Sequence, residues 1–381
     1  MAPSLAIVKQ KYSAFGGAEK VITAAVQALG GDGDLQVSIL ARSWSDGSRA
    51  AFPHCRVVRC NPPYLGRSMR DRSFVRAVTR RMQGYDLVQA HESLPGAHIY
   101  RAGSGLHQQW LTQLTREASA AERQRIFEAK KNRVTMELER SMFAHPALRA
   151  VIANSPMVVA NIAETFPEFD QSRVHLIWNG VNHAQFSPAL RAARRASSRE
   201  LLQLRPTDQA LLVLGSGWQR KGVATALQAL AELPPDVILL VAGKESRPQR
   251  YQQMALELGI EPARLRWVGA TTDPLALYAA ADVFLLPSLY DQMPNASLEA
   301  MACGLPLVVS STSGTRDLIE DGREGYVRDW WRPSDWIGPI SQCLASSESM
   351  GAQAHQTVLP YTFERMIQEW RQLYASLLPS S

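Results

Sequence analysis

Residues 282–310 read DVFLLPSLYDQMPNASLEAMACGLPLVVS, and this stretch decides the fold. The apolar run at 282–288 predicts a buried strand, and the good helix formers at 296–304, which end in a glycine, predict a helix. The next apolar run, at 305–311, predicts a second strand. A strand, a helix and another strand in succession form a βαβ unit, whose two strands lie parallel in one sheet.

The same alternation extends through the 381 residues on either side of a basic, polar stretch at 191–208. Before it, strands are predicted within 4–10, 35–43, 85–93, 149–154 and 173–181; after it, strands and helices alternate from 209 onward. The expected fold class is therefore α/β, with two Rossmann-like, doubly wound parallel-sheet domains facing a cleft. The expected domains are 1–182 and 183–362.

Composition sets broad limits on function. Hydrophobic residues make up 46% of the chain, enough for two cores, and the net charge of +6 does not discriminate between anionic partners. The four cysteines, none in a CxxC pair, predict free thiols rather than a metal cluster. The apolar run near the start is too short for a signal peptide and no run would span a membrane, so we expect a soluble, cytoplasmic chain.

Two carboxylates flank the start of the 296–304 helix. Asp291 falls in the loop after the strand, and Glu299 falls about one turn into the helix. One carboxylate could contact a sugar hydroxyl and the other a vicinal diol, while backbone N–H groups of 295–297 hold a phosphate. A helix-start acid that only stabilises the helix dipole would explain either residue alone, but not the pair within this Pro- and Gly-framed loop.

Two further motifs suit an anion. Arg220 and Lys221 follow the strand at 209–217 and would fit a pyrophosphate, although an Arg-Lys pair can also be an ordinary solvated pair. Gly16 and Gly17 precede a predicted helix, where either a phosphate or a simple tight turn would need them. Neither the dinucleotide pattern GxGxxG nor the Walker spacing is present, which disfavours NAD enzymes and ATPases.

In order and spacing, these motifs resemble the GT-B glycosyltransferases of family 4, a retaining, metal-independent class. The family carries E-x7-E in a strand-loop-helix, and here Asp291-x7-Glu299 is followed by AMACGLPLVVS. Supporting matches are FGGAEK at 15–20, IWNGVNHAQFSP at 177–188, RKGVATALQALAEL at 220–233, LRWVGATTD at 265–273 and LYAAADVFLLPS at 277–288. The segment 92–111 further resembles the bacterial subset that adds hexoses to the lipopolysaccharide core.

The resemblance implies a role for each matching residue. Gly16 and Gly17 would approach the donor sugar or its phosphate, and Arg220 and Lys221 would neutralise the leaving pyrophosphate. Asp291 would contact the donor sugar and Glu299 the ribose hydroxyls. The segment Met293, Pro294, Asn295, Ala296 and Ser297 would complete the binding site for the donor. Val268 and Gly269 would pack against the nucleobase, and His91 would contact the donor sugar. A capping or structural role for His91 remains an alternative.

The implied reaction moves a hexose from a nucleotide-sugar, here a UDP-hexose, to a membrane-associated glycolipid of the lipopolysaccharide core. The resemblance implies no metal or cofactor, because fixed cations and a helix N-terminus stabilise the leaving diphosphate in place of a divalent metal. It implies no dedicated base, because the leaving phosphate itself accepts the acceptor's proton. In GT-B chains the C-terminal helix, here within about 363–381, packs back on the first domain. Nucleic acid is not an expected partner, because no binding motif is present.

The chain departs from the family pattern at two positions. Asp291 replaces a glutamate one methylene longer, and Ser104 stands where close relatives would carry an acid, which weakens any role for Arg101 or His107 in that pocket. These departures keep open a catalytically weak scaffold that binds nucleotide-sugars. Another GT-B chemistry, such as sugar-nucleotide epimerisation or glycan phosphorolysis, also remains open.

Two charged segments bear on membrane contact. Residues 64–83 are strongly basic, and residues 107–143 mix basic, acidic and apolar side chains at helical spacing. Either could lie on an anionic membrane at the inner face of the bacterial inner membrane, or could form ordinary solvated helices of the domain.

Overall fold

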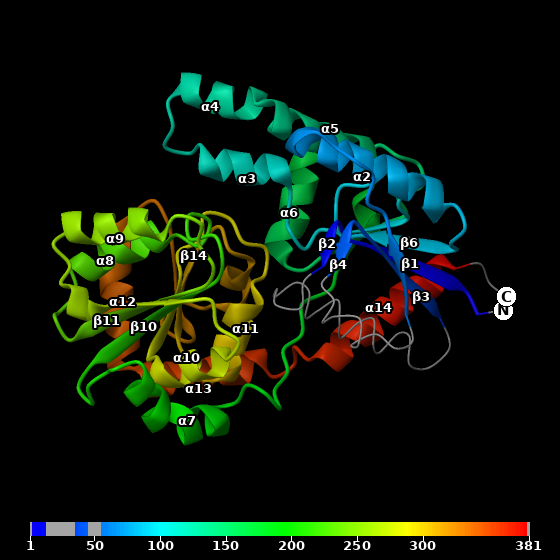
Figure 1. Cartoon of the computed structure of the whole chain (residues 1–381). Coiled ribbons are helices and arrows are strands. Elements are labelled where there is room, and N and C mark those ends of the chain that lie inside the picture. The colour runs from blue at the N-terminus through cyan, green and yellow to red at the C-terminus, as the bar shows by residue number, and fades with distance from the viewer. Residues whose placement is uncertain (1, 13–34, 45–54, 379–381) are drawn as a thin grey trace. The chain divides into compact units, whose positions relative to one another are not determined.

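The computed structural model describes residues 2–12, 35–44 and 55–378, which form two compact units (Figure 1). Unit 1 is Met1–Asn179 together with Phe363–Ser381, and unit 2 is Gly180–Thr362. Each unit contains one large parallel sheet flanked by helices. This arrangement confirms the predicted fold class of two doubly wound α/β domains.

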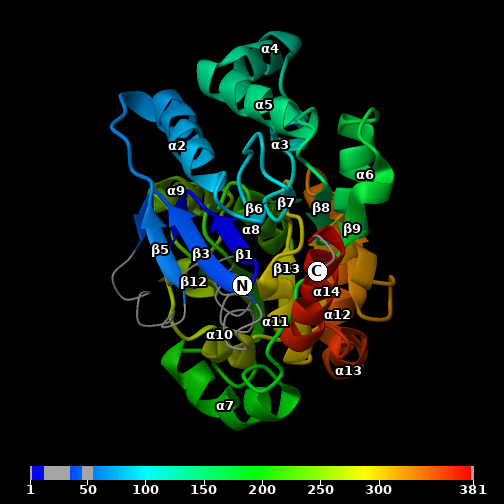
Figure 2. The same ribbon diagram turned by 90° about the vertical axis from the view of Figure 1, so that its right-hand side faces the viewer.

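In unit 1, the described residues form a seven-stranded sheet in the order β5-β3-β1-β6-β7-β8-β9 (Figure 2). Its strands are β1 (Ser4–Val8), β3 (Gln36–Ala41), β5 (Arg56–Arg59), β6 (Leu87–Ala90), β7 (Ile99–Arg101), β8 (Ala150–Ala153) and β9 (Val174–Leu176). A separate pair joins β2 (Lys11–Tyr12) and β4 (Ser43–Trp44). The described helices are α2 (Gly66–Met82), α3 (His107–Leu114), α4 (Ala120–Glu128), α5 (Lys130–Phe143), α6 (Pro156–Thr165), the 3-10 helix η2 (Gln171–Arg173) and α14 (Phe363–Leu377).

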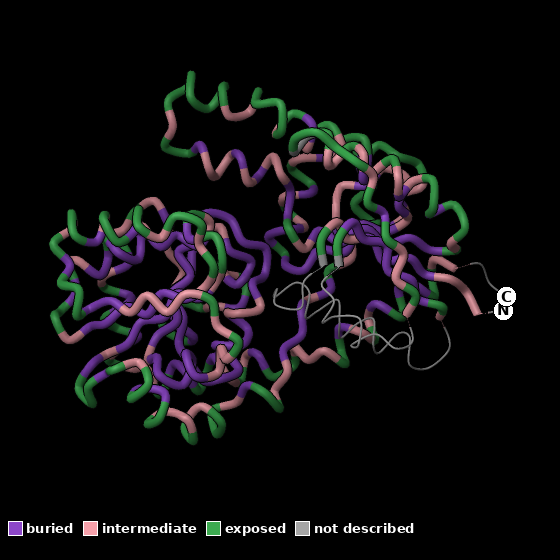
Figure 3. Tube along the Cα trace, in the orientation of Figure 1, coloured by how far each residue is buried: buried purple, intermediate pink, exposed green. Residues whose placement is uncertain are grey.

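Alternating side chains of β1 build two cores, one on each face of this sheet. Leu5 and Ile7 pack in a cluster with Trp370 and other residues of α14. Ala6 and Val8 pack on the opposite face with α2. Successive residues of a strand point to opposite faces, so a strand buried on both sides is apolar throughout. Burial follows this arrangement, with the inner strands of the sheet buried and the outer sides of the helices exposed (Figure 3).

In unit 2, the sheet order is β12-β11-β10-β13-β14-β15, again with parallel pairing. Its strands are β10 (Gln209–Leu214), β11 (Val237–Ala242), β12 (Leu265–Gly269), β13 (Val283–Leu286), β14 (Leu307–Ser310) and β15 (Gly325–Arg328). The helices are α7 (Pro188–Leu201), α8 (Val223–Ala231), α9 (Pro248–Glu257), α10 (Pro274–Ala280), α11 (Asn295–Ala302), α12 (Ile337–Ala345) and α13 (Ser347–Val358), with 3-10 turns η3 (Pro262–Arg264), η4 (Gly314–Leu318) and η5 (Pro333–Trp336).

The strand order of unit 2 reverses between β10 and β13. From β10 the chain builds outward through β11 and β12, and then returns to β13 and builds the other way through β14 and β15. In open parallel sheets a ligand binds beyond the carboxyl ends of the strands at this reversal. The loops after β10 and β13 are therefore the place to look for a site.

Within the described part of the chain, no helix has both the length and the apolar composition needed to cross a bilayer. The four cysteines are all described, and none is in a disulfide.

Candidate functional site

The loop after β10 is shaped by a glycine that no other residue can replace without strain. Gly222 has φ 69°, in the left-handed region, and caps the N-terminus of α8. A Cβ atom added there would lie 1.7 Å from the carbonyl oxygen of Pro287, at the end of β13. This close approach joins the two loops at the strand reversal and fixes the backbone on which Arg220 and Lys221 are presented.

We predict that Gly222→Ala lowers the free energy of unfolding by about 2–4 kcal/mol, because left-handed strain and a backbone clash combine. Gly217→Ala is the matched control, since Gly217 also has a positive φ (76°) but nothing lies within 4 Å of its added Cβ. Its cost should be about 1 kcal/mol, from backbone strain alone. Urea unfolding measures both, and equal losses in the two variants would contradict the close approach at Pro287.

The loop after β13 is held from the other side by the start of η4. The backbone N–H of Asp291 donates to the carbonyl of Thr312 (3.1 Å), and the N–H of Gly314 donates to the carbonyl of Asp291 (2.8 Å). The hydroxyls of Ser310 and Thr312 both donate to the carbonyl of Ser288 (2.7 and 2.9 Å). The backbone of Asp291 is thus fixed in place independently of its side chain.

The two loops bring three charged side chains together. Lys221 Nζ lies 2.6 Å and an Arg220 guanidinium nitrogen 3.0 Å from Oδ2 of Asp291. Lys221 and Asp291 are buried, whereas Arg220 is half-exposed. From the sequence we assigned the cations to a pyrophosphate and the carboxylate to a sugar, without expecting the direct contact between them.

Burial and charge act in opposition on these groups. Burial alone would raise the pKa of Asp291, but Arg220 and Lys221 together hold it below its ordinary value. Burial lowers the pKa of Lys221, and Asp291 partly offsets that effect. The cluster carries two cations and one anion, and so it has an excess positive charge at the carboxyl end of the sheet.

The second predicted acid, Glu299, lies in α11 and is buried. The hydroxyl of Tyr278, from α10, lies 2.9 Å from Oε2 of Glu299 and 3.1 Å from the carbonyl of Ala296. Burial, followed by the charge of Glu299, raises the pKa of Tyr278 well above its ordinary value, so the hydroxyl keeps its proton and donates. We did not predict Tyr278, because a tyrosine in an apolar helix gives no signal beyond packing.

The segment from Met293 to Ser297 leads into α11, which begins at Asn295. The N–H and hydroxyl of Ser297 both donate to the carbonyl of Pro294 (3.1 and 2.7 Å), and the hydroxyl also lies 2.7 Å from that of Thr315. A phosphate contact by the Ser297 N–H would therefore have to replace its bond to Pro294. The roles assigned to Met293, Asn295 and Ala296 stay predictions.

Val268 and Gly269 lie at the end of β12, where the carbonyl of Gly269 accepts from the N–H of Gly243 (2.6 Å). The neighbouring Trp267 ring stacks on Trp218, from the loop after β10, with centroids 5.3 Å apart. This stack joins the outer strand to the loop that carries the cations. Val268 and Gly269, the residues predicted to contact the nucleobase, thus lie at the carboxyl end of the sheet, as does the loop that carries Lys221.

In unit 1, His91 follows β6 and is buried beside α14. Its Nε2 lies 3.1 Å from Nε2 of Gln89, whose Oε1 accepts from the hydroxyl of Tyr374 (2.7 Å). Burial, with smaller effects from Arg101 and Lys9, holds the pKa of His91 well below its ordinary value. The ring is therefore neutral at pH 7, and the amide of Gln89 indicates that Nε2 is its acceptor nitrogen.

The remaining residues singled out from the sequence also belong to unit 1. Arg101 is buried and donates to Oδ1 of Asn179 (2.6 Å), whereas Ser104 lies exposed in the turn after β7. His107 begins α3, where its ring contacts Asn132 (3.1 Å). Gly16 and Gly17 lie outside the described residues. In the part of the chain that is described, no group of three or more His, Cys, Asp or Glu residues could hold a metal ion.

Sequence comparisons match both halves of the chain. A profile described as "Glycosyltransferase Family 4" matches residues 15–185, and one described as "Glycosyl transferases group 1" matches residues 208–346. D-inositol 3-phosphate glycosyltransferase of Segniliparus rotundus is 29% identical over 216 residues, 55% of this chain and 47% of that protein. Alpha-maltose-1-phosphate synthase of Mycolicibacterium smegmatis is 31% identical over 190 residues, 48% of each chain. The matched region spans about half the length of these curated relatives.

Solved structures match almost the entire chain. WaaG, a glycosyltransferase involved in lipopolysaccharide biosynthesis, has a TM-score of 0.81 at 19% identity and covers 97% of this chain and 99% of its own. Anabaena HepE in complex with UDP-glucose has a TM-score of 0.75 at 18% identity and covers 98% and 99%. At these identities the likeness establishes the fold, which is that of GT-B glycosyltransferases.

Proposed function

Because this chain belongs to the family 4 glycosyltransferases of the GT-B fold, we propose that it transfers a hexose from UDP-hexose to a glycolipid acceptor, with retention at the anomeric carbon. The observation that carries the proposal is the buried pair of Lys221 and Asp291, with Arg220 beside it, at the strand reversal of unit 2. Such a cluster supplies fixed positive charge where a diphosphate would sit.

The chemistry follows from that charge. Transfer breaks the bond between the anomeric carbon and the diphosphate oxygen and leaves negative charge on UDP. Lys221 and Arg220 stabilise this charge, and a phosphate oxygen takes the proton from the acceptor hydroxyl that forms the new glycosidic bond. Both cation contacts of Asp291 fall on Oδ2, so Oδ1 is the oxygen assigned to the hydroxyls of the donor sugar.

The other predicted residues are assigned to binding of the donor rather than to the reaction itself. Glu299, held by Tyr278, is assigned to the ribose hydroxyls, and Val268 and Gly269 to the nucleobase. The turn Met293–Ser297 is assigned to the phosphates and His91 to the donor sugar. Gly16 and Gly17 are assigned, from the family resemblance, to the donor sugar or its phosphate.

The relatives support two classes of acceptor. WaaG supports a lipopolysaccharide acceptor, which would place the enzyme at the inner face of the bacterial inner membrane. The curated relatives named D-inositol 3-phosphate glycosyltransferase support a soluble, phosphorylated polyol instead. We propose the glycolipid because the match to WaaG extends over 97% of this chain.

The donor is tested by thermal unfolding with UDP-, GDP- and ADP-glucose. A ligand at a hundred times its Kd stabilises the folded state by about 2.7 kcal/mol, which raises Tm by a few degrees. We expect UDP-glucose to give the largest rise, and no rise with any UDP-hexose would contradict the proposed donor. Radiolabel from the bound donor should then enter the lipid-extractable fraction. Label in a water-soluble product would favour the polyol, and binding without transfer would favour a scaffold.

A further inference from the structure

The sheet of unit 1 has a strand reversal of its own, and His91 lies at it. From β1 the chain builds outward through β3 and β5, and then returns to β6 and builds the other way. His91 directly follows β6, and its N–H donates to the carbonyl of Val8, the last residue of β1 (3.0 Å). In an open parallel sheet, the strand reversal is where side chains meet a ligand. The topology therefore supports a ligand contact at His91 independently of any family resemblance.

Two side chains of the C-terminal helix α14 bear on this histidine. The hydroxyl of Tyr374 donates to Oε1 of Gln89 (2.7 Å), and Nε2 of Gln89 lies 3.1 Å from Nε2 of His91. The ring of Trp370, four positions before Tyr374, lies 6.5 Å from the imidazole between centroids. Gln89, Trp370 and Tyr374 are almost completely buried, so water competes little for these hydrogen bonds.

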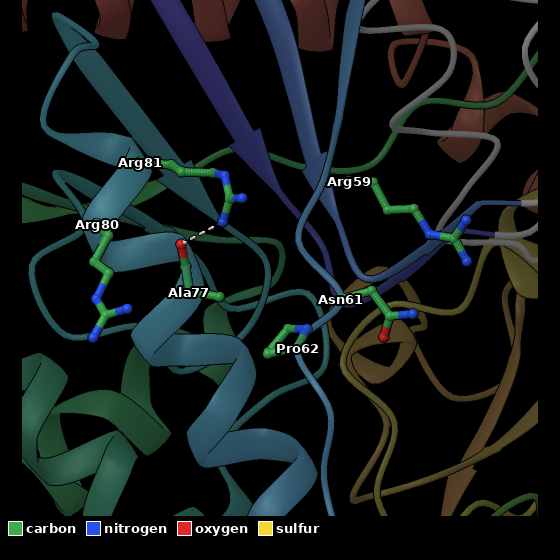
Figure 4. Close-up of a pocket in the computed structure, with 6 residues that line it drawn as sticks. All are labelled: Arg59, Asn61, Pro62, Ala77, Arg80 and Arg81. Carbon is green, nitrogen blue, oxygen red and sulfur yellow. Dashed lines mark hydrogen bonds between the residues drawn. The ribbon is translucent and has the colours of Figure 1, made fainter.

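A basic pocket elsewhere in unit 1 lacks such a convergence of side chains. It lies beside α2 and is lined by Arg59, Asn61, Pro62, Ala77, Arg80 and Arg81 (Figure 4). The guanidinium groups of Arg59 and Arg80 point away from each other, so they do not define one ligand. The contacts made by Gln89 and α14, by contrast, all bear on one imidazole ring.

The directions of the two hydrogen bonds follow from the groups that make them. Burial raises the pKa of Tyr374, so its hydroxyl keeps its proton and needs an acceptor for it. An amide oxygen accepts and an amide nitrogen donates, so the oxygen of Gln89 faces Tyr374 and its nitrogen donates to Nε2 of His91. Because Nε2 accepts, the proton of a neutral His91 ring lies on Nδ1.

The surroundings of the ring keep it neutral. Burial, followed by the positive charges of Arg101 and Lys9, holds the pKa of His91 well below its ordinary value. Arg101 belongs to the neighbouring strand β7, and its Cζ lies 5.5 Å from the centroid of the Trp370 ring. Among the described residues, Nδ1 of His91 has no hydrogen-bond partner. Its N–H is therefore the group that the ring has left for a ligand.

We propose that Tyr374 is a positioning residue, which acts through Gln89 to hold His91 in the tautomer that presents an N–H at Nδ1 to an oxygen of the ligand. The proposed function enters only in naming that oxygen as one of a donor-sugar hydroxyl. A hydroxyl can accept or donate, so the tautomer of the ring decides the direction of the contact. The C-terminal helix thus sets the polarity of a contact at the strand reversal of unit 1.

Nitrogen NMR of protein labelled with 15N in its histidines, recorded without nucleotide, tests the tautomer directly. A ring nitrogen that carries a proton differs widely in chemical shift from one that does not, and His91→Gln identifies the signals of this ring. We expect a proton on Nδ1 and none on Nε2. In Tyr374→Phe the amide of Gln89 is no longer held, so part of the population should move its proton to Nε2. A proton on Nε2 in the unmodified protein, or an unchanged ring in Tyr374→Phe, would overturn the proposal.

The matched control is Tyr100→Phe, which removes another buried hydroxyl of unit 1. The hydroxyl of Tyr100 donates to the carbonyl of Gly105 (3.4 Å), and its side chain is on the opposite face of the sheet from that of Arg101. The His91 signals should therefore stay unchanged. A tautomer change in this control as large as in Tyr374→Phe would mean a general response to packing, and would contradict a specific relay through Gln89.

Transfer from UDP-hexose gives the second readout. Tyr374→Phe should lower kcat/KM about 2- to 10-fold, the usual effect of losing one neutral hydrogen bond. Gln89→Met interrupts the same relay and should change the tautomer in the same way, so the test does not depend on the folding of one variant. The double variant should lose no more activity than Gln89→Met alone, and additive losses would overturn the relay.

Two further outcomes separate this inference from the proposed function. If the tautomer changes in Tyr374→Phe and kcat/KM does not, the positioning role is wrong. If the unmodified protein transfers no hexose from UDP-hexose, the proposed function fails, and the His91 signals, recorded without donor, still decide whether Tyr374 sets the tautomer.

Discussion

Lys221→Met should lower kcat for sugar transfer by about 100- to 1,000-fold, the usual effect of removing one group that stabilises developing negative charge. Lys221 is buried and contacts Asp291 at 2.6 Å, so no solvent ion can easily take its place. Single-turnover transfer from UDP-hexose measures the effect. The loss should fall mainly on kcat, because the charge on the diphosphate grows as the sugar–oxygen bond breaks.

Two comparisons make this result specific. Lys221→Arg keeps the charge and should recover part of the lost rate, although the longer planar group fits the buried position less well. Arg250→Met removes an exposed cation of α9 and should leave the rate unchanged. Arg220 still pairs with Asp291 in Lys221→Met, so the variant should remain folded by thermal unfolding. Normal kcat in a folded Lys221→Met protein would contradict the assigned role.

Glu299→Gln should raise the Kd for UDP by about 10- to 100-fold, because a carboxylate that accepts ribose hydroxyls contributes about 1.5–3 kcal/mol. Glutamine keeps an acceptor for the Tyr278 hydroxyl, which lies 2.9 Å from the carboxylate, so the variant removes charge with little change in packing. Calorimetry with UDP measures the affinity directly.

The matched control for this variant is Glu257→Gln, an exposed glutamate of α9 in the same unit. It should bind UDP as tightly as the unmodified protein. If Glu299→Gln instead lowers kcat and leaves the affinity for UDP unchanged, Glu299 acts on the reacting atoms rather than on the ribose. The ribose assignment would then be wrong.

The continuous apolar strands could be predicted from the sequence, whereas two half-polar edge strands could not. β1, β10, β11 and β13 each fall within a predicted apolar run, because strands buried on both faces leave a continuous hydrophobic signal. The edge strands β5 (Arg56–Arg59) and β15 (Gly325–Arg328) are half-polar, so their residues give no such run. The family resemblance, which rested on motifs along most of the chain, is confirmed by the two matching profiles.

The structural role of the basic stretch at 191–208 could not be predicted from the sequence. Within it, α7 carries Arg191, which donates to the carbonyls of Ala281 (2.9 Å) and Gly304 (3.2 Å) just beyond the ends of α10 and α11. Arg195 pairs with Asp282 (2.6 Å). These arginines satisfy carbonyls at helix ends that are far away in the sequence, so no local pattern could reveal their role.

The site was predicted residue by residue, but its internal contacts were not. The sequence placed Asp291 and the two cations each after a strand, but it did not show that the two strands are neighbours in the sheet. The approach of Gly222 to Pro287 joins the two loops. Tyr278 reaches Glu299 from a different helix, 21 positions earlier in the chain. Contacts of this kind depend on tertiary packing, which periodicity and motif spacing do not encode.

In the proposed reaction, the position of Asp291 has a consequence for the release of the nucleotide product. Its carboxylate is a resident anion, so the trio with Arg220 and Lys221 offers a nucleotide one excess positive charge rather than two. Two uncompensated cations at this position would hold the more negative product too tightly and slow each cycle. If the proposed donor is correct, this built-in counter-ion should limit the affinity of the site for the nucleotide product and so favour its release.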